Sequence, residues 1–170
     1  RDCMDGSACA VLFNLLYPGA EVVFVAAHEA EDVPNRESYA TIFADVCPST
    51  CLPHEVVLDH HKSSFEKLRE VRPTSVLDDS RCGAKLLYDH LAMTVSGIAY
   101  DRWRVFGKFC DVVDDYDRWQ LTMPQSKDLA RLHQFLRQHT FIRMMSDHLT
   151  TIDPYWMTQG NVMPGGWLQV

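Results

Sequence analysis

The first half of the chain repeats a short apolar run followed by polar residues. Four runs have the length of a strand, are rich in β-branched and aromatic residues, and end near a polar or turn residue. They span residues 21–26, 40–44, 55–58 and 74–77. Helical patterns lie between or after them, at residues 7–16, 64–69 and 83–93. This alternation predicts an α/β domain built around a mostly parallel sheet flanked by helices.

The second half of the chain has a different pattern. Apolar residues recur at helical spacing over residues 100–119, which end in an acidic cluster, and again over residues 126–144. Residues 153–170 combine prolines, glycines and aromatic residues, and we expect them to be irregular or to begin a further domain. One principal domain is therefore predicted over residues 1–150, with a short appendage over residues 151–170.

Composition narrows the class of partner. The 170 residues are 46% hydrophobic, which suffices for the core of one domain, and they carry a formal net charge of −7 with a pI near 5.5. Such a chain lacks the excess of Lys and Arg that neutralises many phosphates in a duplex groove. An acidic protein can still bind phosphate if its carboxylates hold divalent cations, because the cations make the local field positive. We therefore expect no duplex DNA groove and no membrane partner, but small phosphate-containing ligands stay open.

Cysteine usage and hydropathy favour a cytoplasmic protein. Six cysteines are too few for a disulfide-rich secreted scaffold, and we find no stretch with the pattern of a signal peptide or a membrane span. Cys47, Cys51 and His54 lie close in sequence, but they lack the second ligand pair of a closed zinc site. Reduced thiols without structural zinc are the expectation.

Ionisable residues stand where the predicted strands end. Asp45 follows the second run, and Asp59, His60 and His61 follow the third. Open parallel sheets bind ligands outside the carboxyl ends of their strands, so these positions favour function. Each residue also has a structural alternative, because Asp59 can cap the next helix and Asp45 can start a turn.

Two further acidic segments extend the pattern. Asp2 and Asp5 precede the first predicted helix, and Gly6 permits a close approach of the backbone. The helix over residues 100–119 ends with four acids: Asp111, Asp114, Asp115 and Asp117. An N-cap and an exposed helix end are the structural alternatives. Taken together, the four segments carry carboxylate and imidazole ligands that suit Mn²⁺ and related ions, and they favour a site for two such ions.

The order of these segments, DCMDG, D, DHHKS, SRCGA and DDYDRW, resembles the DHH phosphoesterase superfamily over residues 2–119. That superfamily includes single-strand exonucleases, oligoribonucleases, cyclic-dinucleotide phosphodiesterases, exopolyphosphatases and family II pyrophosphatases. The resemblance implies a Rossmann-like DHH catalytic domain whose first strand and first-motif histidine would precede Arg1. Most members also carry a second, substrate-selecting domain, at which only Gly165 and Gly166 hint in this chain.

The resemblance also implies the metal ligands. Two divalent ions, most commonly Mn²⁺ with Mg²⁺ or Co²⁺ as alternatives, would be bound by Asp2, Asp5, Asp45, His60 and Asp115. Asp45 would bridge the two ions. Asp115 is favoured over Asp114 as the ligand from the last motif, because of its spacing to Trp119.

The remaining roles concern the substrate. In the resemblance, Asp59 orients the two histidines and His61 faces the substrate phosphate. Arg81 or Lys62 would also contact a phosphate, although either is equally well explained as a surface charge.

The expected activity is hydrolysis of phosphodiester bonds in short oligonucleotides or single-stranded nucleic acid, by a hydroxide that two metal ions activate. A small-nucleotide or cyclic-dinucleotide phosphodiesterase, or a pyrophosphatase, is the alternative within the enzyme class. A non-catalytic metal-binding or assembly module with the same fold is the alternative outside it. The four tryptophans are expected to be packing residues, although an exposed one near the site would be able to stack a nucleobase.

Overall fold

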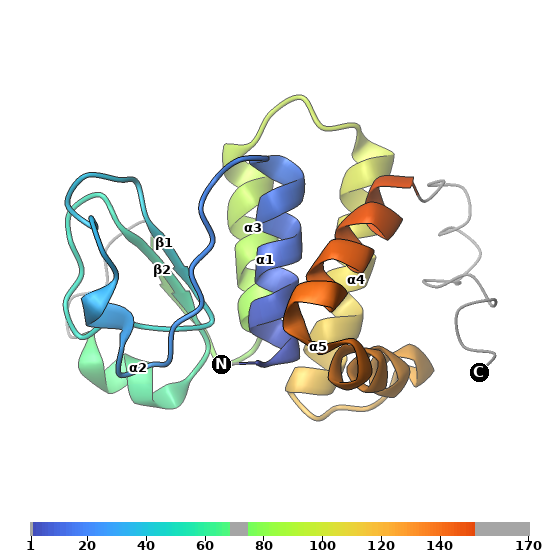
Figure 1. Cartoon of the computed structure of the whole chain (residues 1–170). Coiled ribbons are helices and arrows are strands. Elements are labelled where there is room, and N and C mark those ends of the chain that lie inside the picture. The colour runs from blue at the N-terminus through green and yellow to red at the C-terminus, as the bar shows by residue number, and fades with distance from the viewer. Residues whose placement is uncertain (1, 69–74, 152–170) are drawn as a thin grey trace.

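A three-stranded parallel sheet lies beside a bundle of helices in the computed structural model, which describes residues 2–68 and 75–151 (Figure 1). The strands are ordered β1 (Ile42–Ala44), β2 (Val56–Asp59) and β3 (Val76–Leu77). The helices are α1 (Met4–Leu16), the short 3-10 helix η1 (Ala30–Asp32), α2 (Lys62–Lys67), α3 (Gly83–Thr94), α4 (Tyr100–Asp117) and α5 (Pro124–Thr151). The prediction of an α/β fold with a parallel sheet and a helical second half is confirmed.

The main core lies among the helices rather than within the sheet. α3 contacts β1 and β2 as well as α1 and α4, and α1 also contacts α5. Figure 1 shows α1 and α3 between the sheet and the α4–α5 pair. In α4 the buried apolar residues recur every three or four positions, as in Val105, Phe109 and Val113, which gives the helix one face toward this core. The packing brings the first turns of α1 and α3 to the carboxyl ends of the strands.

The strand predicted over residues 21–26 is wrong. No strand is assigned there, although the segment is rich in β-branched residues. Its side chains pack on two clusters instead. Val22 and Phe24 join the main core, where the Phe24 ring meets the edge of His139 on α5 at 6.5 Å between centroids, and Val25 packs against a smaller cluster that includes Phe43 and Val57 of the sheet. Burial of these side chains therefore satisfies the apolar pattern of the segment without ladder pairing.

Helix α5 is longer than predicted and is interrupted. It continues to Thr151, and Arg137 inside it has a φ of 59° and a ψ of 163°, which are not helical values. Helix α5 therefore consists of two helical halves joined at Arg137. Residues 152–170, which include the segment predicted to be irregular, lie outside the described residues. Among the described helices, none has both the length and the apolar composition to cross a membrane.

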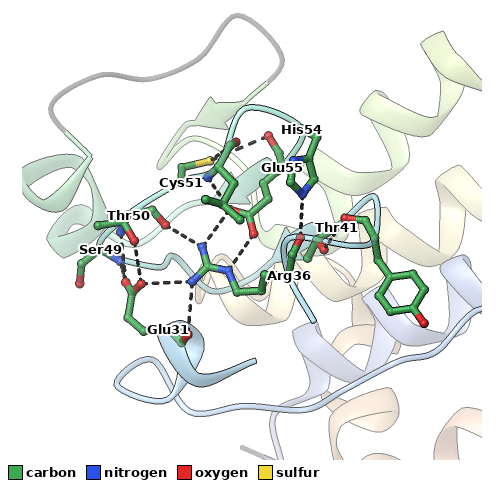
Figure 2. Close-up of polar contacts among 10 residues, drawn as sticks. Glu31, Arg36, Thr41, Ser49, Thr50, Cys51, His54 and Glu55 are labelled. Atoms are coloured by element: carbon green, nitrogen blue, oxygen red, sulfur yellow. Dashed lines mark hydrogen bonds and ion pairs between the residues drawn. The ribbon is translucent and has the colours of Figure 1, made fainter. Parts of the chain in front are cut away.

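A buried ion pair holds the loop between β1 and β2 (Figure 2). Two guanidinium nitrogens of Arg36 donate to the two carboxylate oxygens of Glu55, at 2.7 and 2.8 Å, and Glu55 is 1% exposed. Arg36 also donates to Glu31 and to the carbonyl of Thr50. Glu31 accepts in turn from the backbone amides of Ser49 and Thr50. We call these five residues the Arg36 cluster; it fixes the loop that leads out of Asp45.

Candidate metal centre

Two acids mark the carboxyl end of the sheet. β1 and β2 pair in register, with Ala44 opposite Leu58, so Asp45 and Asp59 emerge side by side. The backbone of Asp45 takes a left-handed φ of 61°, while its amide still donates to the carbonyl of Leu58 at 3.0 Å. Left-handed backbone in a non-glycine residue is uncommon and clusters at functional sites. The chain therefore turns sharply at the residue predicted to bridge two ions.

His60 is the centre of the acidic cluster. Its Nε2 lies 3.2 Å from Asp45 Oδ1, 3.5 Å from Asp117 Oδ2 and 3.6 Å from Asp5 Oδ2. Two sets of ligand atoms, each within 4.8 Å of one another, would be able to hold a metal ion: Asp5, His60 and Asp117 form one, and Asp45, Asp59, His60 and His61 form the other. His60 belongs to both sets. The predicted segments thus converge from α1, β1, β2 and α4.

The charges in this cluster are poorly balanced. Burial raises the pKa of Asp5 well above its usual range, and the charges of Asp45 and Asp117 raise it further. The pKa of Asp117 is raised by burial and by Asp45. Burial opposes the charge of His60, but the hydrogen bond to Asp45 and the nearby carboxylates outweigh it and raise its pKa to about 9. Even a protonated His60 leaves three carboxylates with one positive charge, an imbalance that a divalent cation would relieve.

The first turn of α3 holds Asp5 in place. The backbone amides of Gly83 and Ala84 donate to the two oxygens of Asp5 at 2.7 and 2.8 Å. A helix N-terminus favours a carboxylate because its amides are unpaired within the helix. A side chain at Gly83 would place its Cβ 2.7 Å from the Cβ of Asp45. Glycine is therefore required here for α3 to approach both acids.

Asp59 orients the neighbouring histidine. It is 1% exposed, its Oδ1 lies 2.7 Å from His61 Nδ1 and accepts from the amide of His60, and its Oδ2 accepts from the hydroxyl of Ser64. Burial opposes its charge, but the hydrogen bonds from His61 and Ser64 hold the pKa of Asp59 below its usual value. Because protein donors occupy both of its oxygens, Asp59 fits the predicted orienting role better than that of a ligand.

Asp117 stands at the position for which the sequence favoured Asp115. Both acids lie on the last turn of α4, but Asp117 Oδ2 faces His60, whereas Asp115 is buried against the turn that follows the helix. Asp115 Oδ1 accepts from Thr122, and Oδ2 accepts from the amide of Met123. Asp114 accepts from the amide of Cys82 at 2.6 Å. The sequence places four acids within seven residues and does not show which of them faces His60. Their positions around the helix decide this, because only Asp117 of the last turn points toward His60.

Asp2 does not join either set of ligand atoms. Its Oδ1 lies 3.4 Å from Nε2 of His133, a buried histidine of α5 that also contacts the hydroxyl of Ser7 at 2.9 Å. Burial lowers the pKa of His133. The structure thus places His133 in the core beside α1.

The two predicted phosphate-binding cations differ in their surroundings. The guanidinium of Arg81 is engaged by Asp78 at 2.6 Å and by Asp89 at 2.5 Å. The side chain of Lys62 is 84% exposed and has only a loose ion pair, 3.6 Å, with Asp79. Lys62 directly follows His61, so its ammonium is the freer of the two to meet a substrate.

Cys3 is a component that sequence reasoning missed. Its thiol donates to Asp45 Oδ2 at 3.2 Å, and its sulfur accepts from the amide of Gly6, which caps α1. Burial, with the charge of Asp45, raises the pKa of Cys3 to about 12, so the group is a neutral thiol. Nothing in a single cysteine between two aspartates signals this contact. Among the described residues, Cys47, Cys51 and His54 form no group suited to a metal.

Comparisons with known proteins add no assignment to this geometry. No protein-family model matches the chain, and neither the curated proteins nor the solved structures gave a significant match. The residues that converge on His60 are therefore the basis for assigning a function.

Proposed function

We propose that the chain is the catalytic domain of a DHH-type, metal-dependent phosphoesterase. The observation that carries this proposal is the convergence of three carboxylates from separate segments within 3.6 Å of one imidazole nitrogen. Three carboxylates this close together, with Asp5 fully buried, are unfavourable unless a cation binds. Carboxylate and imidazole donors together suit Mn²⁺ and similar ions.

Some residues of the site would bind metal, and others would contact the substrate. Asp5, Asp117 and His60 would hold one ion, and Asp45 would hold a second or bridge the two. Bound divalent ions supply a water nucleophile at neutral pH and neutralise phosphoryl charge. The remaining contacts with the substrate would be made by side chains of the protein.

His61 is the group that would meet the phosphate. Its side chain is 54% exposed, in contrast to the 16% of His60, and Asp59 fixes one ring nitrogen. The hydrogen bond that His61 donates to Asp59 raises the pKa of His61, so the imidazole is disposed to carry the proton and positive charge that a phosphoryl oxygen would meet. Lys62, the next residue in the chain, would add a second positive charge. We take short oligonucleotides as the substrate class, because the acidic chain offers few cations for a long strand.

The test combines metal binding with turnover. We would titrate Mn²⁺ by calorimetry and assay a dinucleotide, bis(p-nitrophenyl) phosphate and pyrophosphate for wild type, Asp45→Ala and His61→Ala. Asp101→Asn, a change on the far end of α4, is the matched control. We expect Asp45→Ala to lose Mn²⁺ binding and turnover, and His61→Ala to bind Mn²⁺ normally but lose roughly 100- to 1,000-fold in kcat.

The outcomes separate the competing functions. Full activity in Asp45→Ala would refute the bridging role. Normal Mn²⁺ binding without hydrolysis of any phosphate by the wild type would instead favour a non-catalytic metal-binding module. Preference for pyrophosphate over the dinucleotide would reassign the substrate but keep the reaction class.

A further inference from the structure

The turn that follows α4 is fixed by Asp115. The carboxylate accepts from both the amide and the hydroxyl of Thr122 and from the amide of Met123, and the carbonyl of Asp115 accepts from the amides of Gln120 and Leu121. One residue thus provides five acceptor contacts to the segment 120–123. The turn is therefore held firmly where it leaves the metal centre, only two residues after Asp117.

This rigid turn presents Trp119 to solvent. The residue is 69% exposed, and its backbone has a φ of 57°, with the amide donating to the carbonyl of Tyr116 at 3.0 Å. A left-handed φ in a bulky residue is an outlier, because glycine or asparagine meets such a backbone far more easily. Packing does not explain the tryptophan either, since its main ring contact is an edge of Tyr116 at 5.6 Å. Neither the backbone nor the core accounts for an indole at this position.

We propose that Trp119 is a stacking platform for the nucleobase of a substrate whose phosphate lies at the metal centre, which makes it a specificity-determining residue. This inference rests on the proposed phosphoesterase function. Two residues of chain span at most about 7 Å, so Trp119 lies within roughly one nucleotide of Asp117. An exposed, rigidly held indole stacks on any base, because every base has a π-face.

The platform would select the class of substrate. Phosphodiesters that carry a base gain a contact that pyrophosphate, polyphosphate and abasic phosphodiesters lack. Stacking on an aromatic side chain strengthens binding by roughly 5- to 150-fold. The gain is tolerant of sequence, so the preference would be for nucleotides as a class and not for one base.

The kinetic test compares substrates with and without a base. Trp119→Ala and Trp119→Phe would be assayed with Mn²⁺ on a 5′-phosphorylated dinucleotide and on the same phosphodiester lacking both bases. We expect Trp119→Ala to raise KM for the dinucleotide by roughly 5- to 150-fold, to leave KM for the abasic compound unchanged, and to leave kcat near that of wild type. Trp119→Phe, which keeps an aromatic face, is expected to retain most of the affinity. Equal effects on both substrates, or no effect on either, would overturn the proposal.

A binding measurement keeps this test separate from the proposed activity. Titration of the dinucleotide into wild type is expected to quench tryptophan fluorescence, and the quench is expected to disappear in Trp119→Phe, which retains the other three tryptophans. Absence of hydrolysis with this quench intact would reject the phosphoesterase but support the platform. Hydrolysis of the dinucleotide with an identical quench in Trp119→Phe would reject the platform alone.

Discussion

Two clusters of acids, each with one fully buried member, differ in how their charge is balanced. In the Arg36 cluster, the guanidinium meets Glu55 with two hydrogen bonds and reaches Glu31 as well. In the candidate metal centre, three carboxylates surround one imidazole, which supplies at most one positive charge. Burial opposes the charge in both clusters, but Arg36 holds the pKa of Glu55 below its usual value, whereas the pKa of Asp5 is raised.

The difference separates a structural role from a binding role. The charge of an acid such as Glu55 is balanced by a cation from the same chain. Removal of that cation leaves a buried charge unpaired and destabilises the fold. A set of acids without a cation is destabilising until an external ion binds, so its energetic advantage appears only with the ligand. The predictions below test this division, from the largest expected effect to the smallest.

The largest effect is expected at the ion pair. Arg36→Met leaves Glu55 buried and unpaired, which we expect to lower the free energy of unfolding by about 3–5 kcal/mol in urea titrations. Arg131→Met, which breaks an exposed pair with Asp128, is the matched control and is expected to change stability by less than about 1 kcal/mol. The double variant Arg36→Met with Glu55→Leu should recover much of the loss, since no buried charge then remains unpaired. Equal losses in Arg36→Met and its control would contradict a structural role for the cluster.

The second effect depends on metal. Mn²⁺ at 100 times its Kd is expected to raise the free energy of unfolding by about 2.7 kcal/mol, and EDTA is expected to reverse the gain. Asp117→Asn should shrink this response because it removes a ligand. Without metal, the same variant should be slightly more stable than wild type, by about 0.5 kcal/mol, because it removes one of the repelling charges. Asp101→Asn on the same helix should respond to Mn²⁺ as wild type does, and an undiminished response in Asp117→Asn would remove Asp117 from the site.

The third effect sharpens the division within α4. Burial opposes the charge of Asp115, but hydrogen bonds from Thr122, Ser126 and nearby amides lower its pKa to about 2. A lowered pKa contributes stability that is complete above the unfolded value near 4 and is lost as pH falls toward 2. Asp115→Asn should therefore cost about 2 kcal/mol at pH 7 and much less near pH 2, as measured by urea unfolding at each pH. A constant cost across this range would show that ionisation of Asp115 is not the source of its stability.

The local patterns predicted much of the fold. The strands β1 and β2 and the helices α1, α3 and α4 follow from apolar runs and spacing in the sequence; α4 buries one face, whereas α1 and β2 are buried on nearly all sides. The segment 21–26 has a local pattern similar to that of β2, but its side chains pack on the helical core and on the small cluster beside the sheet without forming a strand. Strand formation depends on a pairing partner that lies elsewhere in the chain, and periodicity carries no information about that partner.

The site was predictable in its segments but less so in its atoms. Asp5, Asp45, His60 and His61 converge because parallel strands and helix N-termini meet at one edge of the sheet. The choice between Asp115 and Asp117 depends on the helical phase at the end of α4, where a difference of two residues turns the side chain to another face. The Cys3 contact and the close approach of Gly83 depend on the spacing of α1 and α3, which no local pattern records.

Because Gly83 has no side chain, the first turn of α3 can lie close to Asp45. Substitutions among the acids cannot reproduce this short distance. The backbone of α3 at Gly83 packs directly against Asp45, and one added methyl group at Gly83 would push the helix and Asp45 apart. A designer who transfers this centre to another scaffold must therefore copy the spacing of a helix N-terminus from a strand end before choosing any ligand. The spacing between this helix and the sheet sets the limits within which any choice of ligand side chains can work.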